Sequence, residues 1–376
     1  MDAAPFIREE GNGRLRLPGF CDVHVHFREP GFEAKGTIAT ESAAALAGGY
    51  TDVFTMPNLA PVPDAPETLA PQLEAIRRTA AVRVHPFASI SKGEKGLEIS
   101  DLEALAPLVP GFSDDGRGVQ DAGLLREAMR RAKDLERPIV AHCEDNSLLV
   151  PGGCIHAGHW AEEHGFTGIS SASEWKMVER DLGLVRETGC RYHVCHVSTK
   201  ESVALLRAAK AEGLPVTCET APHYLVLTED DLRDEGRFKM NPPLRAAADR
   251  AALREGILDG TIDCIATDHA PHTDEEKSRG LRGSPFGVVG LECAFPVLYT
   301  DLVRTGIIPL ETIIDRLCVR PRAIFGLPEP DPDRDYVIVD TAFSGFIDSL
   351  AFRSKAHATP FDGRPVACRI IETKVG

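Results

Sequence analysis

The sequence lacks several features that would assign the protein to common classes. No apolar run approaches the roughly 18 residues that a membrane-spanning helix needs, and the stretch from Met1 to Arg16 has no apolar segment of the kind found in secretory signals. Basic residues are the minority, with 42 Lys and Arg against 57 Asp and Glu, for a formal net charge of −15. A surface this acidic repels nucleic acids and anionic membranes. We therefore expect a cytoplasmic protein with no nucleic-acid or membrane partner.

Paired cysteines are also missing. The ten cysteines contain no CxxC pair, which argues against a structural zinc ribbon. Cys143, Cys195, Cys218 and Cys264 each stand alone in an apolar, strand-like run. This placement is typical of buried, reduced thiols. We predict that all ten are free.

What the sequence does contain is a recurring alternation of two patterns. Short apolar runs rich in β-branched residues are followed by polar or Gly/Pro-containing turns, and then by longer stretches with apolar residues at helical spacing. The predicted strands are 19–26, 50–57, 83–90, 108–115, 138–145, 191–198, 215–223 and 264–271. The predicted helices are 39–47, 67–79, 121–135, 173–188, 200–211, 250–258, 291–304 and 310–319.

Eight strands, each followed by a helix or a long loop, predict an α/β fold of the (β/α)8 TIM-barrel type. An open, doubly wound sheet is the alternative that periodicity allows. We assign the barrel to residues 18–327, ending at the Pro- and Asp-containing linker 328–335. Strand-like runs at 336–340 and 366–375 predict a small β appendage formed by residues 1–17 and 328–376.

A histidine pair ends the first predicted strand. His24 and His26 are two residues apart, so their side chains share one face of the strand and can bind one divalent metal ion. Such a pair alone is as often a solvated strand face as a metal site. Its weight comes from further residues of metal-binding type, each at the C-terminal end of another predicted strand: Asp115, His142, His196 and Asp268. Because these strand ends meet at one rim of a barrel, we expect all six side chains to converge.

Four imidazoles and two carboxylates suit zinc or a similar divalent ion. Asp115 is placed to bridge two ions, which would lower the pKa of a shared water and make metal-bound hydroxide the nucleophile. Asp268 is predicted to bind one ion and to act as general acid and base. Taken singly, His142 and His196 would more often be core histidines and Asp115 a turn residue.

An anionic substrate of so acidic a protein needs a local cationic site. Arg28 follows the histidine pair by two residues, and its guanidinium matches a carboxylate. Asn58, Asn241 and His272 also lie at predicted strand ends or turns, and we predict that they bind substrate. Residues 273–287, charged and rich in glycine, are expected to form a mobile loop over the barrel mouth.

The other histidines are assigned no metal role. His193 is expected to face the opposite side of its strand from His196, while His156, His159 and His164 fall in a polar stretch that is expected to be surface. His223 ends the seventh strand and could line the pocket.

These residues lie in motifs through which the chain resembles type I dihydroorotases of the amidohydrolase superfamily over nearly its whole length. The motifs are PGFCDVHVHFREPG at 18–31, TMPN at 55–58, FSDDG at 112–116, AHCED at 141–145, CHVST at 195–199, MNPPLR at 240–245, ATDHAPH at 266–272 and FRSKAHATPFDG at 352–363. Eight motifs in family order make a specific match.

The resemblance implies the same six metal ligands, with Asp268 as general acid and base. It also implies that Arg28, Asn58, Asn241 and His272 hold the substrate's carboxylate and ring, with a contribution from His26. The implied reaction is the zinc-dependent, reversible cyclisation of N-carbamoyl-L-aspartate to L-dihydroorotate in pyrimidine biosynthesis, with one or two zinc ions per chain. The sequence leaves open a homodimer and a complex with an aspartate carbamoyltransferase.

Two departures from the family pattern bear on this reading. Many superfamily members bridge their metals with a carboxylated lysine, whereas here the fourth strand ends in Ser113, Asp114 and Asp115, which indicates the aspartate-bridged branch. Fewer than twenty residues precede the strand that carries the histidine pair, so the β appendage is expected to be reduced. The alternatives are a hydantoinase- or allantoinase-like enzyme and a non-catalytic subunit of an aspartate carbamoyltransferase complex, and no metal ligand is missing as it would be in the latter.

Overall fold

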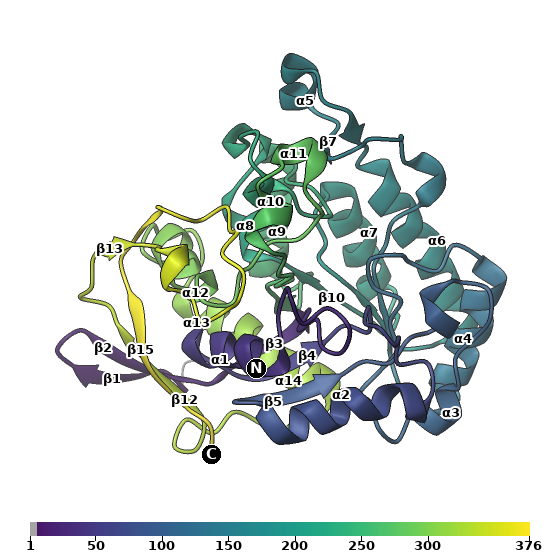
Figure 1. The fold of residues 1–376 in the computed structure, drawn as a ribbon, viewed down its shortest axis with the longest axis horizontal. Coiled ribbons are helices and arrows are strands. Elements are labelled where there is room, and N and C mark those ends of the chain that lie inside the picture. Colours follow the sequence, from purple (N-terminus) through teal and green to yellow (C-terminus); the bar gives the residue numbers. More distant parts are fainter. Residues whose placement is uncertain (1–5) are drawn as a thin grey trace.

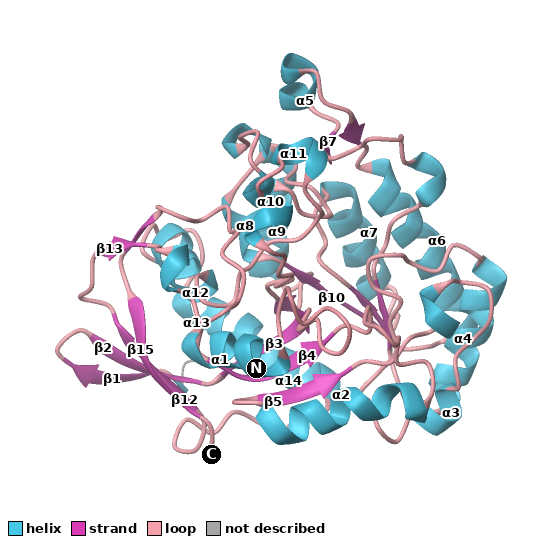
Figure 2. Ribbon diagram, viewed as in Figure 1, coloured by secondary structure: helices cyan, strands magenta, loops and turns pink. Residues whose placement is uncertain are grey.

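The barrel is assembled from two arcs of parallel strands in the computed structural model, which describes residues 6–376. One arc is β3 (Phe20–Val25), β4 (Tyr50–Thr55) and β5 (Arg83–Pro86); the other is β6 (Ile139–Ala141), β9 (Tyr192–Val194), β10 (Val216–Thr220) and β11 (Cys264–Ile265). Figures 1 and 2 show β3, β4 and β10 in the middle of the molecule.

Isolated bridges close the ring between the two arcs. Phe112 pairs in parallel with Ala88 on one side and with Ile139 on the other, and Val25 pairs with His269 at the opposite junction. The fourth predicted strand, 108–115, is therefore reduced to a single bridging residue, because Pro110 has no backbone N–H and the chain turns sharply at both ends of the run. The α/β barrel itself is confirmed.

Helices surround the strands on the outside (Figure 2). The main ones are α1 (Ile38–Ala47), α2 (Pro66–Thr79), α4 (Ala122–Asp134), α6 (Ala172–Thr188), α7 (Lys200–Ala211) and α9 (Ala247–Asp259), each within a few residues of its predicted range. The last two predicted helices are α12 (Ala294–Leu298) and α13 (Leu310–Ile314), which continue as π-helical turns to Val303 and Val319. An additional helix, α14 (Arg320–Phe325), ends at Gly326 in a left-handed conformation.

Short helices and strands lie in the connections between the barrel strands and the main helices. They are α3 (Leu102–Leu105), β7 (Ile155–His156), α5 (His159–His164), β8 (Gly168–Ile169), α8 (Pro222–Val226), α10 (Asp274–Lys277) and α11 (Gly280–Gly283). The segment with β7 and α5 projects from the top of the molecule in Figure 1. The predicted loop 273–287 thus contains two helical turns.

Phe325, the last residue of α14, packs against the barrel at the N-terminal end of its strands. Its ring lies 4.7 Å from Phe54, 5.6 Å from Phe87 and 5.5 Å from His193, measured between ring centroids. Phe54 and Phe87 belong to a buried apolar cluster that also includes Cys21, Val23, Met56, Val140, Cys195, Cys264 and Ala266. This packing closes one end of the barrel and leaves the C-terminal end for function.

The chain ends pair in a four-stranded antiparallel sheet beside the barrel. Its order is β1 (Arg8–Gly11), β2 (Arg14–Pro18), β12 (Tyr336–Asp340) and β15 (Arg369–Lys374), with a separate hairpin of β13 (Gly345–Phe346) and β14 (Pro365–Val366). The β appendage is therefore present, although its predicted residues 1–5 lie outside the described part of the chain. The division at residues 17–18 and 327–328 stays a prediction.

The structure also bears on the cysteines and on membrane-spanning helices. All ten cysteines are free and buried. Among residues 6–376, no helix combines the length and the apolar character needed to cross a membrane.

Candidate metal centre and active site

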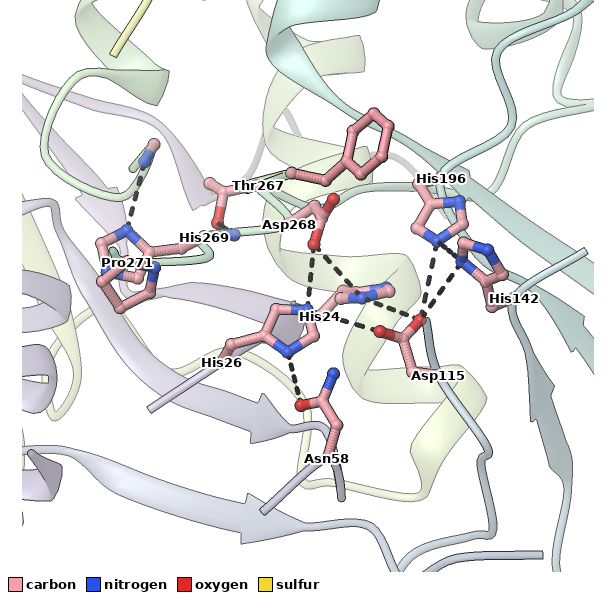
Figure 3. Close-up of polar contacts among 12 residues, drawn as sticks. His24, His26, Asn58, Asp115, His142, His196, Thr267, Asp268, His269 and Pro271 are labelled. Carbon is pink, nitrogen blue, oxygen red and sulfur yellow. Dashed lines mark hydrogen bonds and ion pairs between the residues drawn. The ribbon is translucent and has the colours of Figure 1, made fainter. Parts of the chain in front are cut away.

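His24 and His26, at the end of β3, direct their Nε2 atoms toward the same two carboxylates (Figure 3). His24 Nε2 lies 3.4 Å from an oxygen of Asp115 and 3.4 Å from Oδ1 of Asp268. His26 Nε2 lies 3.4 Å from the other oxygen of Asp115 and 3.1 Å from Oδ1 of Asp268. The alternation of side chains along a strand has thus brought both rings to one point.

A second group of nitrogens faces Asp115 from the opposite side. His142, after β6, and His196, after β9, place Nδ1 and Nε2 only 2.9 Å apart. Asp115 Oδ1 is 3.8 Å from the first nitrogen and 3.6 Å from the second. The Asp115 carboxylate therefore lies between two clusters of ligand atoms, one with His24, His26 and Asp268 and one with His142 and His196.

The six residues fit divalent metal ions. All are buried, yet His24 Nε2 and Asp115 Oδ1 have no hydrogen-bond partner among the described residues. Buried polar atoms are rarely left unpaired unless a ligand satisfies them. Neutral imidazole nitrogens and carboxylate oxygens are the donors that zinc and similar ions take. The buried His and Asp clusters indicate a metal-binding site.

Neighbouring side chains fix the orientation of the two strand histidines. His24 Nδ1 lies 2.6 Å from Oε1 of Glu219, and His26 Nδ1 lies 2.8 Å from Oδ1 of Asn58. Both partners are acceptors, so each Nδ1 carries the proton and the lone pair of each Nε2 is available to a metal ion. Asn58, predicted to bind substrate, thus also orients His26.

Glu219, on β10, was not identified from the sequence. It is fully buried, and although burial alone would raise its pKa, the neighbouring His24 and a hydrogen bond from His193 lower that pKa to about 2. His193 was expected to face away from His196, and the described metal clusters do not contain it. Its Nε2 lies 3.1 Å from Glu219 Oε2, so it contacts the site through that carboxylate.

Cys195 is a further side chain that sequence reasoning left out of the site. It forms a possible ligand group with His24 and Asp115. Burial raises the pKa of its thiol well above the ordinary value, so the thiol is protonated when no ion is bound.

The backbone is strained where three of these side chains leave their strands. Arg28, His196 and Asp268 have φ values of +63°, +35° and +48°, a region that non-glycine residues seldom occupy. Beside Asp268, the buried Asp22 carboxylate accepts hydrogen bonds from the backbone N–H and hydroxyl of Thr267. This contact ties β3 to the end of β11 and sets the position from which Asp268 projects.

The predicted residues surround one cavity of about 230 Å³. Nine of the ten line it, and the tenth, His24, lies beneath the others without solvent exposure. The cavity is completed by Gly116, Ala270, Phe286 and Gly287, the last two from the loop 273–287. The buried His223 does not line it.

One side of the cavity is cationic. Arg28 donates from Nε to the carbonyl of Pro271, and burial lowers its pKa to about 10, so it stays charged at neutral pH. His272 is held between Lys35, whose ammonium donates to Nδ1, and the carbonyl of Phe286, which accepts from Nε2. Burial and the nearby Arg28 lower the pKa of His272 to about 3, so this imidazole is neutral.

Asn241 lies on the facing side. Its amide nitrogen donates to both oxygens of Glu144, at 3.2 and 3.1 Å, while its carbonyl oxygen has no partner among the described residues. Glu144 in turn lies 3.6 Å from Nε2 of His142. Glu144 belongs to the AHCED motif but received no role from the sequence.

Comparison with known proteins shows the family to which the chain belongs. The family profile described as "Dihydro-orotase-like" matches residues 13–202. The chain is 50% identical to the dihydroorotase of Geobacillus sp. (strain WCH70), over 93% of this chain and 83% of the relative. It is 48% identical to that of Bacillus subtilis (strain 168), over 94% of this chain and 84% of the relative. The chain belongs to the dihydroorotase family.

The solved structures that resemble this dihydroorotase carry other names. It superposes on the L-hydantoinase (dihydropyrimidinase) of Arthrobacter aurescens with a TM-score of 0.85 and 26% identity, covering 95% of this chain and 83% of that one. For the dihydropyrimidinase of Brevibacillus agri the TM-score is 0.82 at 21% identity, which shows the shared fold. The (β/α)8 architecture is therefore common to these enzymes.

Sequence identity separates the two groups where the fold does not. The identity to dihydroorotases is about twice that to the hydantoinase. Among residues 6–376, the position between the two ligand clusters is held by Asp115. Both observations favour the dihydroorotase over the hydantoinase or allantoinase alternative, and the protein is a cyclic amide hydrolase.

Proposed function

We propose that this dihydroorotase interconverts N-carbamoyl-L-aspartate and L-dihydroorotate in pyrimidine biosynthesis, with zinc held by His24, His26, Asp115, His142, His196 and Asp268. The single observation that carries the proposal is the position of Asp115 between two buried ligand clusters, beside a cavity with a cationic wall. Two clusters sharing one carboxylate favour two ions per chain over one.

Bound divalent ions would polarise the ring amide carbonyl and lower the pKa of a water molecule, which supplies the nucleophile. The chain's own contribution to proton transfer comes from Asp268. Its carboxylate lies at the cavity surface, within 3.4 Å of the Nε2 atoms of His24 and His26. In hydrolysis it takes the proton of the attacking water and delivers it to the departing ring nitrogen. In cyclisation the same transfers run in reverse.

Binding and orientation fall to the cationic wall and the asparagines. The Arg28 guanidinium presents a planar pair of donors to the substrate carboxylate. Asn58, Asn241 and His272 approach the ring from other sides of the cavity. The volume of about 230 Å³ suits a single six-membered ring with one carboxylate.

The decisive experiment measures metal content per chain beside cyclisation of N-carbamoyl-L-aspartate, in the wild type and in Asp268→Asn. We expect the variant to fold and to lose turnover by about 10²–10⁴-fold, the usual contribution of a positioned acid and base. Dihydroorotate and hydantoin are compared as substrates in the reverse direction. Turnover of hydantoin without dihydroorotate would refute the proposed substrate, and a metal-free active enzyme would refute the proposed site.

Two further parts of the proposal concern the protein's setting. We expect a cytoplasmic location, where pyrimidine synthesis supplies the substrate. Light scattering of the protein, alone and mixed with an aspartate carbamoyltransferase, distinguishes a monomer, a homodimer and a mixed assembly. Activity of the isolated chain excludes a purely non-catalytic role.

A further inference from the structure

The loop 273–287 contains a buried lysine that the proposed reaction does not use. Lys277 is the last residue of α10, a turn that Thr273 caps together with Glu276. Its side chain is only 6% exposed. The Nζ atom donates to three backbone carbonyls, those of Lys239 at 3.1 Å, Pro285 at 3.0 Å and Gly287 at 2.6 Å.

The three carbonyls belong to two segments that both contribute to the lining of the cavity. Lys239 precedes Asn241 by two residues, and its carbonyl also accepts the N–H of Gly287. Pro285 and Gly287 flank Phe286, whose carbonyl accepts from His272. Asn241, Phe286 and Gly287 all line the cavity, whereas Lys277 does not. One ammonium group thus joins the segments 239–241 and 285–287 from behind.

The number of donors matches the number of acceptors. A lysine ammonium carries three N–H donors and no acceptor, and here each donor has a carbonyl. Removing the donors would leave the buried carbonyls of Pro285 and Gly287 without this partner and would leave that of Lys239 with the N–H of Gly287 alone, which favours movement of the two segments. The space is tight, because a Cβ on Gly287 would lie 2.8 Å from Cβ of Ala270 and 3.1 Å from Nε2 of His272.

We propose that Lys277 is a positioning residue for substrate binding: its ammonium holds the segments 239–241 and 285–287 at the separation that the ring of the substrate requires. The inference rests on the proposed function, since it assumes that a cyclic amide occupies this cavity. In this proposal the loop 273–287 is a fixed wall of the cavity, held in place by the hydrogen bonds of Lys277. The sequence had instead predicted a mobile loop over the barrel mouth.

The three hydrogen bonds of Lys277 depend on the positive charge of its side chain. Burial and the nearby Lys239 ammonium lower the pKa of Lys277 to about 7, with Arg28 acting in the same direction and Glu276 in the opposite one. The adjoining hollow on the outer side of the loop is lined by further charged groups: Asp234, Glu235, Arg237, Asp274 and His357. As pH rises through 7, Lys277 loses a proton. The neutral amine keeps two donors and turns a lone pair toward one carbonyl, so its contact with the two segments weakens.

Steady-state kinetics with dihydroorotate test the proposal in the wild type, Lys277→Gln and Lys277→Met, which offer three, two and no donors. We expect KM to rise in that order, by about tenfold or more for the methionine variant, while kcat stays within about threefold, because only binding is lost. Arg279→Met is the matched control, since it removes an exposed cation of the same loop that pairs only with Glu275 among the described residues. Its KM should equal that of the wild type.

The pH dependence separates positioning from a general loss of stability. The ratio of KM between Lys277→Met and the wild type should shrink as pH rises from about 6 to 8.5, because the wild type itself loses the ammonium. Ionisation of the substrate cancels in this ratio.

An unchanged KM in Lys277→Met overturns the proposal, as does a fall in kcat with constant KM. If the methionine variant does not fold, the same criteria apply to Lys277→Gln. Failure of the proposed function shows in a different place, as absence of dihydroorotate turnover by the wild type. A hydantoin-active wild type would allow the same series with that substrate.

Discussion

His24 donates from Nδ1 to Oε1 of Glu219 across 2.6 Å, between two fully buried side chains 195 positions apart in the chain. The carboxylate also accepts from His193 and from the backbone N–H of His196. Through these bonds one acidic group on β10 orients a histidine on β3 and supports another after β9. A carboxylate in this place raises the basicity of the imidazole that faces the metal.

We predict that Glu219→Gln lowers zinc affinity by about 10- to 100-fold, since the amide keeps the shape but removes the negative charge behind His24. Competition with a chromophoric chelator, starting from metal-free protein, measures this affinity. Asp181→Asn is the matched control, because Asp181 is equally buried and accepts from Tyr192 but belongs to neither ligand cluster. Equal affinity losses in the two variants would contradict the assigned role.

Arg28→Lys should raise KM for dihydroorotate by about tenfold or more, because the ammonium cannot present the planar pair of donors that matches a carboxylate. Hydantoin has no carboxylate, so any residual activity toward it should change little. The ratio of kcat/KM between the two substrates is the measurement. Arg117→Lys, at an exposed arginine of the adjoining hollow, serves as the control, and a similar loss there would show that the effect is not specific to the position of Arg28.

Removing the metal should destabilise the protein as well as inactivate it. The ligand atoms of His24 and Asp115 have no partner among the described residues, so an ion that binds the folded state alone adds to its stability by mass action. At a free zinc concentration about 100 times Kd this is roughly 2.7 kcal/mol, enough to shift Tm by several degrees. Calorimetry with chelator and after adding zinc back measures the shift. An unchanged Tm would argue against an ion at these residues.

Acid should weaken the closed end of the barrel. Asp52 on β4 accepts from Arg83 on β5 and from Arg322 on α14, and despite its burial these cations and His85 hold its pKa well below the ordinary value. A carboxyl whose pKa is depressed by folding stabilises the protein above the unfolded value of about 3.9, and that contribution is lost as pH falls further.

Asp52→Asn should therefore lower Tm at pH 7 and flatten its decline between about pH 5 and 3. Thermal scans over this range, with Asp333→Asn as the control at an exposed ion pair with Arg8, test the expectation. A decline as steep as in the wild type would show that other carboxyls govern acid unfolding.

Periodicity and motif spacing were sufficient for the main features of the protein. The alternation of strand and helix patterns predicted the barrel, with an open doubly wound sheet as the alternative, and side-chain alternation in a strand explains why His24 and His26 face the same point. Strand ends of a barrel meet at one rim, which is why Asp115 and Asp268, far apart in the chain, could be expected together. A local pattern is enough to predict a feature that depends on one strand alone, or one that every strand of the barrel repeats.

Other features escaped for identifiable reasons. The fourth strand shortened to the bridge at Phe112, because the pairing depends on neighbours on both sides and not on the apolar run alone. His193 was expected to face the opposite side of its strand from His196, and residue alternation on that strand could not reveal its contact with Glu219 on the next one. The loop 273–287 contains helical turns that depend on the capping by Thr273 and Glu276 and on the carbonyls around Lys277. The charged composition of the loop did not indicate these contacts.

The amino-acid sequence by itself determined the family, the barrel and the residue types that can bind metal, because these follow from patterns within single strands and from motifs in a fixed order. Only the tertiary structure decided which ring nitrogen of His24 and of His26 faces the carboxylates, where the Asp115 carboxylate lies between the ligand clusters, and that one lysine ammonium joins two segments that line the cavity. Hydrogen bonds of this kind depend on distances of a few tenths of an ångström between segments remote in the chain, and no local pattern specifies them.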